Sequence, residues 1–263
     1  MKLRHYRAGH GEPLVLIHGI GSRWQMWEPV IDRLVSRRDV IALDLPGFGT
    51  SPMPPPGTPP GIASLAELVD GFLRDELGIE SAPHVAGNSL GGLLALELAR
   101  RGRARSAAAL SPAGFASRGD MAAARATLWL GVRAARRLAG SADGLMSTLP
   151  GRAVALGPFV ARPSRISPRE AADSLRALAA APWFDATLPA IRPFAGGDVI
   201  EAPVTIAWGD RDRLLPPRQA RRAAREIPGA RFVTLHGCGH IPTYDDPDQV
   251  IRLLLEASGG VSS

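Results

Sequence analysis

The sequence lacks most of what marks a disulfide-bonded or membrane-spanning protein. Cys238 is the only cysteine in 263 residues, so no internal disulfide can form. No apolar run approaches the roughly 18 residues that suggest a membrane span. The amino-terminal segment has no small-residue cleavage site after its short apolar stretch. We therefore expect a cytoplasmic protein without a membrane span.

Aromatic residues are also scarce, at 5%, and Lys2 is the only lysine among 31 basic residues. Nucleic-acid binding would require a basic stripe with interleaved stacking aromatics, so we expect no nucleic-acid partner despite the net charge of +6. No spacing of His, Asp and Cys indicates a metal site, and no glycine-rich phosphate loop is followed by a lysine. We expect no metal and no cofactor.

What remains is an ordinary globular composition, with 45% hydrophobic and 21% charged residues. Apolar runs at 13–17 and 39–43 predict buried parallel strands, and the residues between them have the spacing of one helix face. A helix is predicted over 64–78, with Ser64 and Glu67 as a capping box and Gly78 as its end. The proline-rich segment 51–61 before it predicts an exposed loop.

Strands and helices alternate along most of the chain. The patterns predict the following further strands and helices: strands at 84–87, 106–110, 202–208 and 230–237, and helices at 90–101, 219–229 and 246–258. This alternation predicts an α/β fold with a mostly parallel sheet flanked by helices. Between the strands, residues 115–200 contain only helical patterns. We expect residues 1–114 and 201–263 to form the core and 115–200 a helical cap.

The segment "GNSLGG", 87–92, links a predicted strand directly to a predicted helix. In that context a G-x-S-x-G pattern predicts a sharp turn that exposes the Ser89 hydroxyl. A serine nucleophile needs an adjacent base and an acid that orients the base. His240 and Asp212 both follow predicted strands, and the order Ser, Asp, His is the one expected for such a turn.

Together these features make the chain resemble an α/β-hydrolase of the esterase and carbon–carbon hydrolase type over nearly its whole length. The matching motifs are "HGIG" at 18–21, "DLPGFGTS" at 44–51, "GNSLGG" at 87–92, "WGDRD" at 208–212 and "GCGHIP" at 237–242. The resemblance implies Ser89 as nucleophile, His240 as general base and then acid, and Asp212 as the carboxylate that holds the imidazole. Asp210 is the alternative acid.

The resemblance further implies an oxyanion hole made by the backbone N–H groups of Ile20 and Leu90. His18 is then a structural residue of the "HG" loop rather than a second base. Relatives that hydrolyse epoxides or carbon–halogen bonds use an aspartate nucleophile, so Ser89 argues against both reactions. Hydroxynitrile lyases rely on an active-site lysine, which Lys2 cannot supply.

Several residues are candidates for substrate binding. Trp24 follows the oxyanion loop, whereas Trp129, Trp183 and Phe184 lie in the predicted cap. Asn88 precedes Ser89, a position at which carbon–carbon hydrolases also have asparagine. Ile241 follows His240, where those enzymes typically have tryptophan. The alternative for each aromatic residue is a place in the core.

Nine arginines between Arg100 and Arg137, against the single acid Asp120, suggest a basic lid that favours carboxylate-bearing substrates. The alternative is a solvated helix face.

The predicted activity is hydrolysis of a small-molecule ester, lactone or thioester through an acyl-enzyme, without a cofactor. One alternative is hydrolysis of a carbon–carbon bond in a diketone or dienoate-like ring-cleavage product by the same triad. A second alternative is a ligand-binding protein that keeps the fold without turnover.

Overall fold

The computed structural model describes residues 1–194 and 200–259, in which the strands form one seven-stranded sheet. The strand order is β1-β3-β2-β4-β5-β6-β7. β1 pairs antiparallel with β3, and every other pair is parallel. The strands are β1 (His5–Gly9), β2 (Pro13–Ile17), β3 (Asp39–Leu43), β4 (His84–Asn88), β5 (Ser106–Leu110), β6 (Val204–Gly209) and β7 (Arg231–Leu235). The predicted, mostly parallel sheet is confirmed.

β1 is the strand that the sequence patterns did not predict. Its residues are partly or largely exposed, so no apolar run marks it. It is held at the sheet edge by pairing from His5 opposite Leu43 to Gly9 opposite Asp39. The apolar runs at 13–17 and 39–43, by contrast, coincide with β2 and β3.

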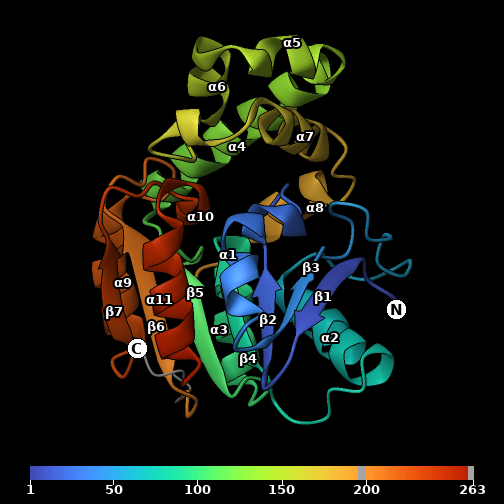
Figure 1. Ribbon diagram of the computed structural model, residues 1–263, viewed down its shortest axis with the longest axis vertical. Helices are drawn as coiled ribbons and strands as arrows, with labels where there is room; N and C mark the ends of the chain where they lie inside the picture. The colour runs from blue at the N-terminus through green and yellow to red at the C-terminus, as the bar shows by residue number, and fades with distance from the viewer. Residues whose placement is uncertain (195–199, 260–263) are drawn as a thin grey trace.

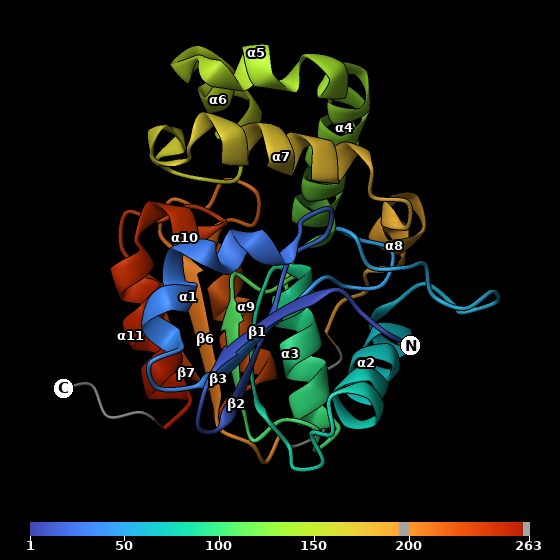
Figure 2. The same ribbon diagram turned by 45° about the vertical axis from the view of Figure 1, so that its right-hand side comes forward.

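Helices cover both faces of the sheet (Figures 1 and 2). Side chains that alternate along the strands separate into two apolar clusters, because successive residues of a strand point to opposite faces. The core helices are α1 (Glu28–Leu34), α2 (Ile62–Gly71), α3 (Leu90–Arg100), α9 (Ala220–Glu226), α10 (Pro242–Asp245) and α11 (Pro247–Ala257). One cluster includes residues of α1 and α11, and the other includes residues of α2, α3 and α9.

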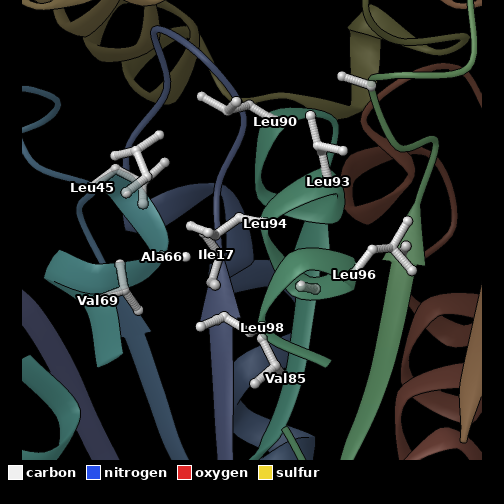
Figure 3. Close-up of a cluster of buried hydrophobic side chains, with 14 of the residues drawn as sticks. Ile17, Leu45, Ala66, Val69, Val85, Leu90, Leu93, Leu94, Leu96 and Leu98 are labelled. Atoms are coloured by element: carbon white, nitrogen blue, oxygen red, sulfur yellow. The ribbon is translucent and has the colours of Figure 1, made fainter. Parts of the chain in front are cut away.

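α3 is the most deeply buried helix of the core. Figure 3 shows Leu94 and Leu98 of α3 beside Ile17 of β2 and Val69 of α2 in one apolar cluster. Every residue from Leu90 to Ala99 is buried. The start of this helix is therefore fixed by packing on several sides.

The entry to α2 differs from the predicted capping box. The helix begins at Ile62 after Gly61, so Ser64 is already inside the helix, and no side chain caps its amino end. The predicted loop 51–61 contains no helix or strand. A π-helical segment, Phe72–Glu76, continues α2, and Gly78 follows with a positive φ of 66°.

The described residues between β5 and β6 form a helical insertion, called the cap below, that lies over one end of the sheet (Figure 1). Its helices are α4 (Arg118–Leu138), α5 (Ala142–Ser147), α6 (Leu149–Leu156), α7 (Pro168–Ala179) and α8 (Phe184–Ala190). The cap has an apolar cluster of its own, which includes Ala135, Met146 and Leu175. Short 3₁₀ segments occur at Trp24–Trp27, Ala139–Ser141, Pro163–Arg165 and Pro217–Gln219. Within the described residues, no helix is both long and apolar enough to cross a membrane.

Candidate active site

Ser89 occupies the turn between the last residue of β4 and the first residue of α3. Its φ of 58° and ψ of −113° place a non-glycine residue in a conformation that costs about 1–3 kcal/mol. Backbone hydrogen bonds hold this conformation: the Ser89 N–H donates to the Leu110 carbonyl at 2.9 Å, and the Ser89 carbonyl accepts from the N–H groups of Leu93 and Ala113, each at 3.0 Å. The predicted sharp turn is present.

Three glycines allow the backbone to come close to this turn. A β-carbon at Gly87 would lie 2.0 Å from the Gly91 carbonyl oxygen, and one at Gly91 would lie 2.2 Å from the Ile17 carbonyl oxygen. A β-carbon at Gly19 would lie 3.2 Å from Cβ of Ser89. The loop that continues into Ile20 therefore lies directly against Ser89.

Ile20 follows that close contact, and Leu90 opens α3 behind the serine. The first N–H groups of a helix have no acceptor inside the helix and lie at its positive end. The Leu90 N–H is such a group. The two residues predicted for an oxyanion hole thus flank Ser89 from the loop and from the helix.

His240 and Asp212 form a buried pair. Nδ1 of His240 lies 2.8 Å from Oδ2 of Asp212, and the residues are 3% and 4% exposed. The other carboxylate oxygen of Asp212 accepts from the N–H groups of Leu214 and Leu215 at 2.9 and 2.8 Å. A carboxylate beside Nδ1 favours the tautomer with the proton on Nδ1, which leaves Nε2 as a base.

Asp210, the alternative acid, has different partners. Its carboxylate accepts from the Gly237 N–H at 2.8 Å and lies 3.4 Å from Nδ1 of His236, whose side chain is 79% exposed.

Burial raises the pKa of the nearby Cys238 thiol to about 12, so this second potential nucleophile stays protonated at neutral pH.

Asn88 joins the serine turn to the histidine loop. Its Nδ2 donates to the Leu110 carbonyl at 3.1 Å and to the His240 carbonyl at 2.8 Å. Both amide protons are therefore used by backbone groups, and the residue is 1% exposed. Asn88 thus links the segments of Ser89 and His240, and its predicted role in substrate binding stays a prediction.

His18 shapes the loop that precedes Ile20. Its Nδ1 lies 2.7 Å from the Gly19 carbonyl, and its Nε2 accepts from the Leu45 N–H at 2.9 Å. Burial lowers the pKa of His18, which keeps the ring neutral. Both ring nitrogens are occupied, as expected for a structural histidine.

Two buried aspartates that hold the site loops were not singled out from the sequence. Asp245 accepts from the Gly239 N–H at 2.7 Å and from the Ala161 and Arg162 N–H groups of the cap at 2.9 and 2.7 Å. Asp44 accepts from the Trp24 N–H at 2.7 Å and from the Thr50 N–H at 2.9 Å. The position of Asp44 directly after a strand was a usable signal, whereas the sequence gives no indication of the cap partners of Asp245.

A cavity of about 100 Å³ lies between the loop that contains Ile20, the cap and α10. Ile20 and Ile241, the neighbours of the candidate catalytic groups, line it, as do apolar cap residues. Those cap residues include Leu128, Leu156, Phe159, Val160, Ile166, Leu175 and Leu178. The cavity can therefore hold an apolar group beside Ile20 and Ile241, whereas Ser89 and His240 themselves are not among its lining residues.

Arg23 and Tyr244, two polar residues of this cavity, both bond to Glu170, whereas Nε of Arg23 is buried without a hydrogen-bond partner. Arg23, which lines it, lies 2.5 Å from Glu170 of α7, and the Tyr244 hydroxyl donates to Glu170 at 2.7 Å. Burial and the charge of Glu170 raise the pKa of Tyr244, so the phenol remains a donor. This cluster joins the cap to the core.

The structure places the other predicted substrate-binding aromatics away from this cavity wall. Trp24 stacks on Tyr6 with ring centroids 5.2 Å apart. Trp183 is 5% exposed and packs against Gly47, and Phe184 is buried against Gly21. Trp129 is 48% exposed on α4. Of the six residues named as candidates for substrate binding, Ile241 lines this cavity.

The basic-lid hypothesis joined arginines that the fold separates. Residues 100–105 precede β5 and lie at the edge of the sheet opposite Ser89; there Arg103 lies 3.5 Å from Asp70 and Arg105 lies 2.6 Å from Glu12. The arginines of α4 are outside the cavity lining, and Arg133 and Arg137 are exposed. The nine arginines therefore do not form one lid over this cavity, and selection of carboxylate-bearing substrates stays a prediction.

Comparisons with known proteins extend over nearly the whole chain. A sequence model described as the alpha/beta hydrolase family matches residues 14–253. The chain is 32% identical to the epoxide hydrolase EphH of Mycobacterium tuberculosis, over 73% of this chain and 92% of that protein. It is 29% identical to a pimeloyl-[acyl-carrier protein] methyl ester esterase of Aeromonas hydrophila, over 94% of this chain and 96% of that protein. A solved structure of a thermophilic esterase from Thermogutta terrifontis matches with a TM-score of 0.74 and 23% identity, covering 97% of this chain and 92% of that one.

Proposed function

The chain belongs to the alpha/beta hydrolase family, and within it we propose that this hydrolase is a cofactor-independent serine hydrolase that cleaves a carboxylic ester, lactone or thioester. The observation that carries the proposal is the buried pair of His240 and Asp212, 2.8 Å apart, together with a serine in a strained turn whose neighbour Asn88 donates to the His240 carbonyl. We also propose, as expected from the sequence, that the protein acts in the cytoplasm.

In the proposed first half-reaction, Oγ of Ser89 attacks the substrate carbonyl carbon while Nε2 of His240 accepts the hydroxyl proton. Asp212 keeps the ring oriented and stabilises the imidazolium. The negative charge that forms on the carbonyl oxygen is stabilised by the N–H groups of Ile20 and Leu90. Collapse of this intermediate breaks the bond to the leaving group, which takes the proton from His240, and leaves an acyl group on Ser89.

In the second half-reaction a water molecule replaces the leaving group. His240 accepts a proton from the water as its oxygen attacks the acyl carbon, and the same two N–H groups stabilise the oxyanion. Collapse breaks the bond to Oγ of Ser89, which regains a proton from His240. The product acid leaves and the free enzyme is restored.

The character of the cavity supports a substrate whose acyl group is apolar and uncharged. Its walls are mainly apolar, and Arg23 is already paired with Glu170. A carboxylate in the acyl chain would have to displace that partner and lose its own hydration. We expect kcat/KM for a neutral ester to exceed that for a matched anionic ester at low salt.

The competing reaction is hydrolysis of a carbon–carbon bond by the same triad. Asn88 was its main support, and the hydrogen bonds of that side chain to two backbone carbonyls explain the residue without reference to a substrate. A panel of acyl esters and one coloured ring-cleavage product separates the reactions. Faster turnover of the ring-cleavage product would favour the carbon–carbon hydrolase.

The proposal is tested with this panel on wild type, Ser89→Ala and Ser111→Ala. Ser111 is a matched control because it is also a buried serine after a strand, 1% exposed, with a positive φ of 43°. We expect Ser89→Ala to lower kcat by roughly 10⁴-fold or more and Ser111→Ala to have a much smaller effect. Wild type without turnover of any panel member would favour a ligand-binding protein instead.

A further inference from the structure

The two sides of α4 have opposite character. Its inner side carries Val132 and Ala135, both fully buried, and Leu128, which lines the cavity. On its outer side Trp129 is 48% and Leu130 61% exposed. Large apolar side chains that are exposed next to each other, with polar residues around them, can mark an interaction surface.

Arginines surround these two apolar residues. The exposed arginines of α4 are Arg118, Arg133, Arg136 and Arg137. We call the exposed side formed by Trp129, Leu130 and these arginines the α4 face. The guanidinium group of Arg133 lies 4.5 Å from the centre of the Trp129 ring, so the basic and apolar groups are in direct contact.

The acids near the α4 face do not neutralise it. Asp120, the single acid of α4, forms an ion pair with Arg218 of the core, and Asp185 of α8 pairs with Arg136 at 2.9 Å. Among the described residues, no ion pair is formed by Arg118, Arg133 or Arg137. The face therefore keeps a net positive charge around its apolar centre.

More exposed apolar residues lie elsewhere on the cap. Leu138 ends α4, and Leu149 and Val154 belong to α6; they are 42%, 57% and 81% exposed. α4 stands at one side of the cap, with α5 and α6 at the end far from the sheet (Figure 2). Exposed apolar groups are thus spread over the outer surface of the cap, and Trp129 also lines a surface hollow of about 520 Å³ together with Leu188 and Pro189.

We propose that the α4 face docks on the surface of an anionic lipid bilayer. A helix with tryptophan and leucine beside arginines is typical of helices that lie in the headgroup layer. Arginine binds phosphate oxygens through two parallel hydrogen bonds, and tryptophan is enriched at the interface. The arginines along α4 place the helix in the plane of the interface.

Charge decides between this partner and the alternatives. A second copy of the chain, related by a two-fold axis, would bring the same arginines against one another. An acidic protein would match the charge, but the spread of exposed apolar residues over α4 and α6 fits a wide, deformable surface better. The lipid bilayer is the partner that accommodates both properties.

Docking in this way would place the cavity close to the membrane. Leu128 lines the cavity, whereas Trp129 and Leu130, about 100° and 200° further around the helix axis, are exposed; the helix diameter is about 10–12 Å. Insertion of Trp129 would therefore bring the cavity wall within about one helix diameter of the headgroups. The binding itself does not depend on the proposed hydrolase activity and can be measured without turnover.

Vesicle co-sedimentation of the full chain tests the proposal, with phosphatidylcholine vesicles that contain or lack phosphatidylglycerol. We expect binding only to the anionic vesicles, and weaker binding as the salt concentration rises. Arg133→Gln with Arg137→Gln should reduce the partition coefficient by roughly fivefold per arginine. Trp129→Ala with Leu130→Ala should reduce it about tenfold or more.

Matched controls alter the same residue types elsewhere. Arg221→Gln with Arg225→Gln removes two exposed charges from α9, and Phe232→Ala removes an aromatic side chain that is 38% exposed on β7. The controls should bind like wild type, and thermal unfolding checks that each variant is folded.

Three results would overturn the proposal. The first is equal binding to neutral and anionic vesicles, or none to either. The second is binding to immobilised polyglutamate but not to anionic vesicles, which would assign the α4 face to an acidic protein. The third is self-association, measured by sedimentation velocity, that Trp129→Ala abolishes in the absence of lipid.

Discussion

At the scale of single residues, two aspartates that are two positions apart have separate surroundings. Asp212 is buried against His240, whereas Asp210 holds the exposed loop at Gly237. We predict that Asp212→Asn lowers kcat by roughly 10⁴-fold because the wrong tautomer of His240 is favoured. Asp210→Asn serves as the control and should change kcat only a few-fold. Equal losses in the two variants, with thermal unfolding unchanged, would contradict this assignment.

Sequence motifs were sufficient to propose Ser89, Asp212 and His240, since each follows a strand in a short motif. They were less informative about residues whose partners are distant in the chain. The amide of Asn88 donates to the carbonyl of His240, 152 positions away. The sequence does not show this contact, so the asparagine suggested a role in substrate binding instead. Asp245 likewise contacts the cap 83 and 84 positions away.

At the scale of elements, the junction of β4 and α3 depends on close backbone contact. A β-carbon at Gly91 would meet the carbonyl oxygens of Ile17 and His18 at 2.2 and 2.6 Å. We predict that Gly91→Ala lowers the free energy of unfolding by about 3 kcal/mol, because backbone must move to make room. Urea denaturation measures this change.

Gly131 provides the control for that substitution. It lies inside α4, and a β-carbon there would have no neighbour within 4 Å. Gly131→Ala should leave stability unchanged or raise it by up to about 1 kcal/mol, since alanine favours helix. If both variants unfolded at the same urea concentration, the close backbone contact at Gly91 would not determine the stability of this junction.

Periodicity located most elements because buried strands and helix faces have regular apolar spacing. It failed for β1, whose residues are partly exposed, and for the start of α2, where Gly61 rather than Ser64 precedes the helix. The place of Trp129 in the predicted cap suggested a pocket wall or a core position, and periodicity did not show that its side chain is 48% exposed on α4.

At the scale of the whole molecule, the cap and the core are joined by polar contacts around the cavity. Arg23 of the core and Glu170 of α7 form an ion pair in which each side chain is 17% exposed. We predict that Glu170→Gln lowers the free energy of unfolding by about 2 kcal/mol, because Arg23 would lose its main charged partner while partly buried. The same change should raise KM, since the cavity wall becomes less ordered.

Asp143→Asn is the control for the loss of a cap ion pair. Asp143 pairs with Arg176 at 2.5 Å, but the two side chains are 80% and 40% exposed. Solvent screens such a pair, so we expect no resolvable change in unfolding or KM. A comparable effect of the two variants would show that burial at Glu170 does not matter.

The order of the chain predicted that the cap interrupts the core between β5 and β6. It could not predict which cap side chains meet the core, because those contacts join segments such as Arg23 and Glu170, 147 positions apart. The arginines at 100–105 and those of α4 are close in sequence, yet they lie at opposite ends of the strand β5 and are separated by its length. Charge counted along the chain therefore misplaced the basic surface.

The most direct test of the account is fluorophosphonate labelling followed by peptide mass mapping. The reagent forms a stable adduct only with a serine that a neighbouring base activates. We predict one adduct on Ser89 in wild type and in Ser111→Ala, and none in Ser89→Ala. Labelling that persists in Ser89→Ala, or wild-type protein that takes up no label, would contradict the assignment of Ser89 as the nucleophile.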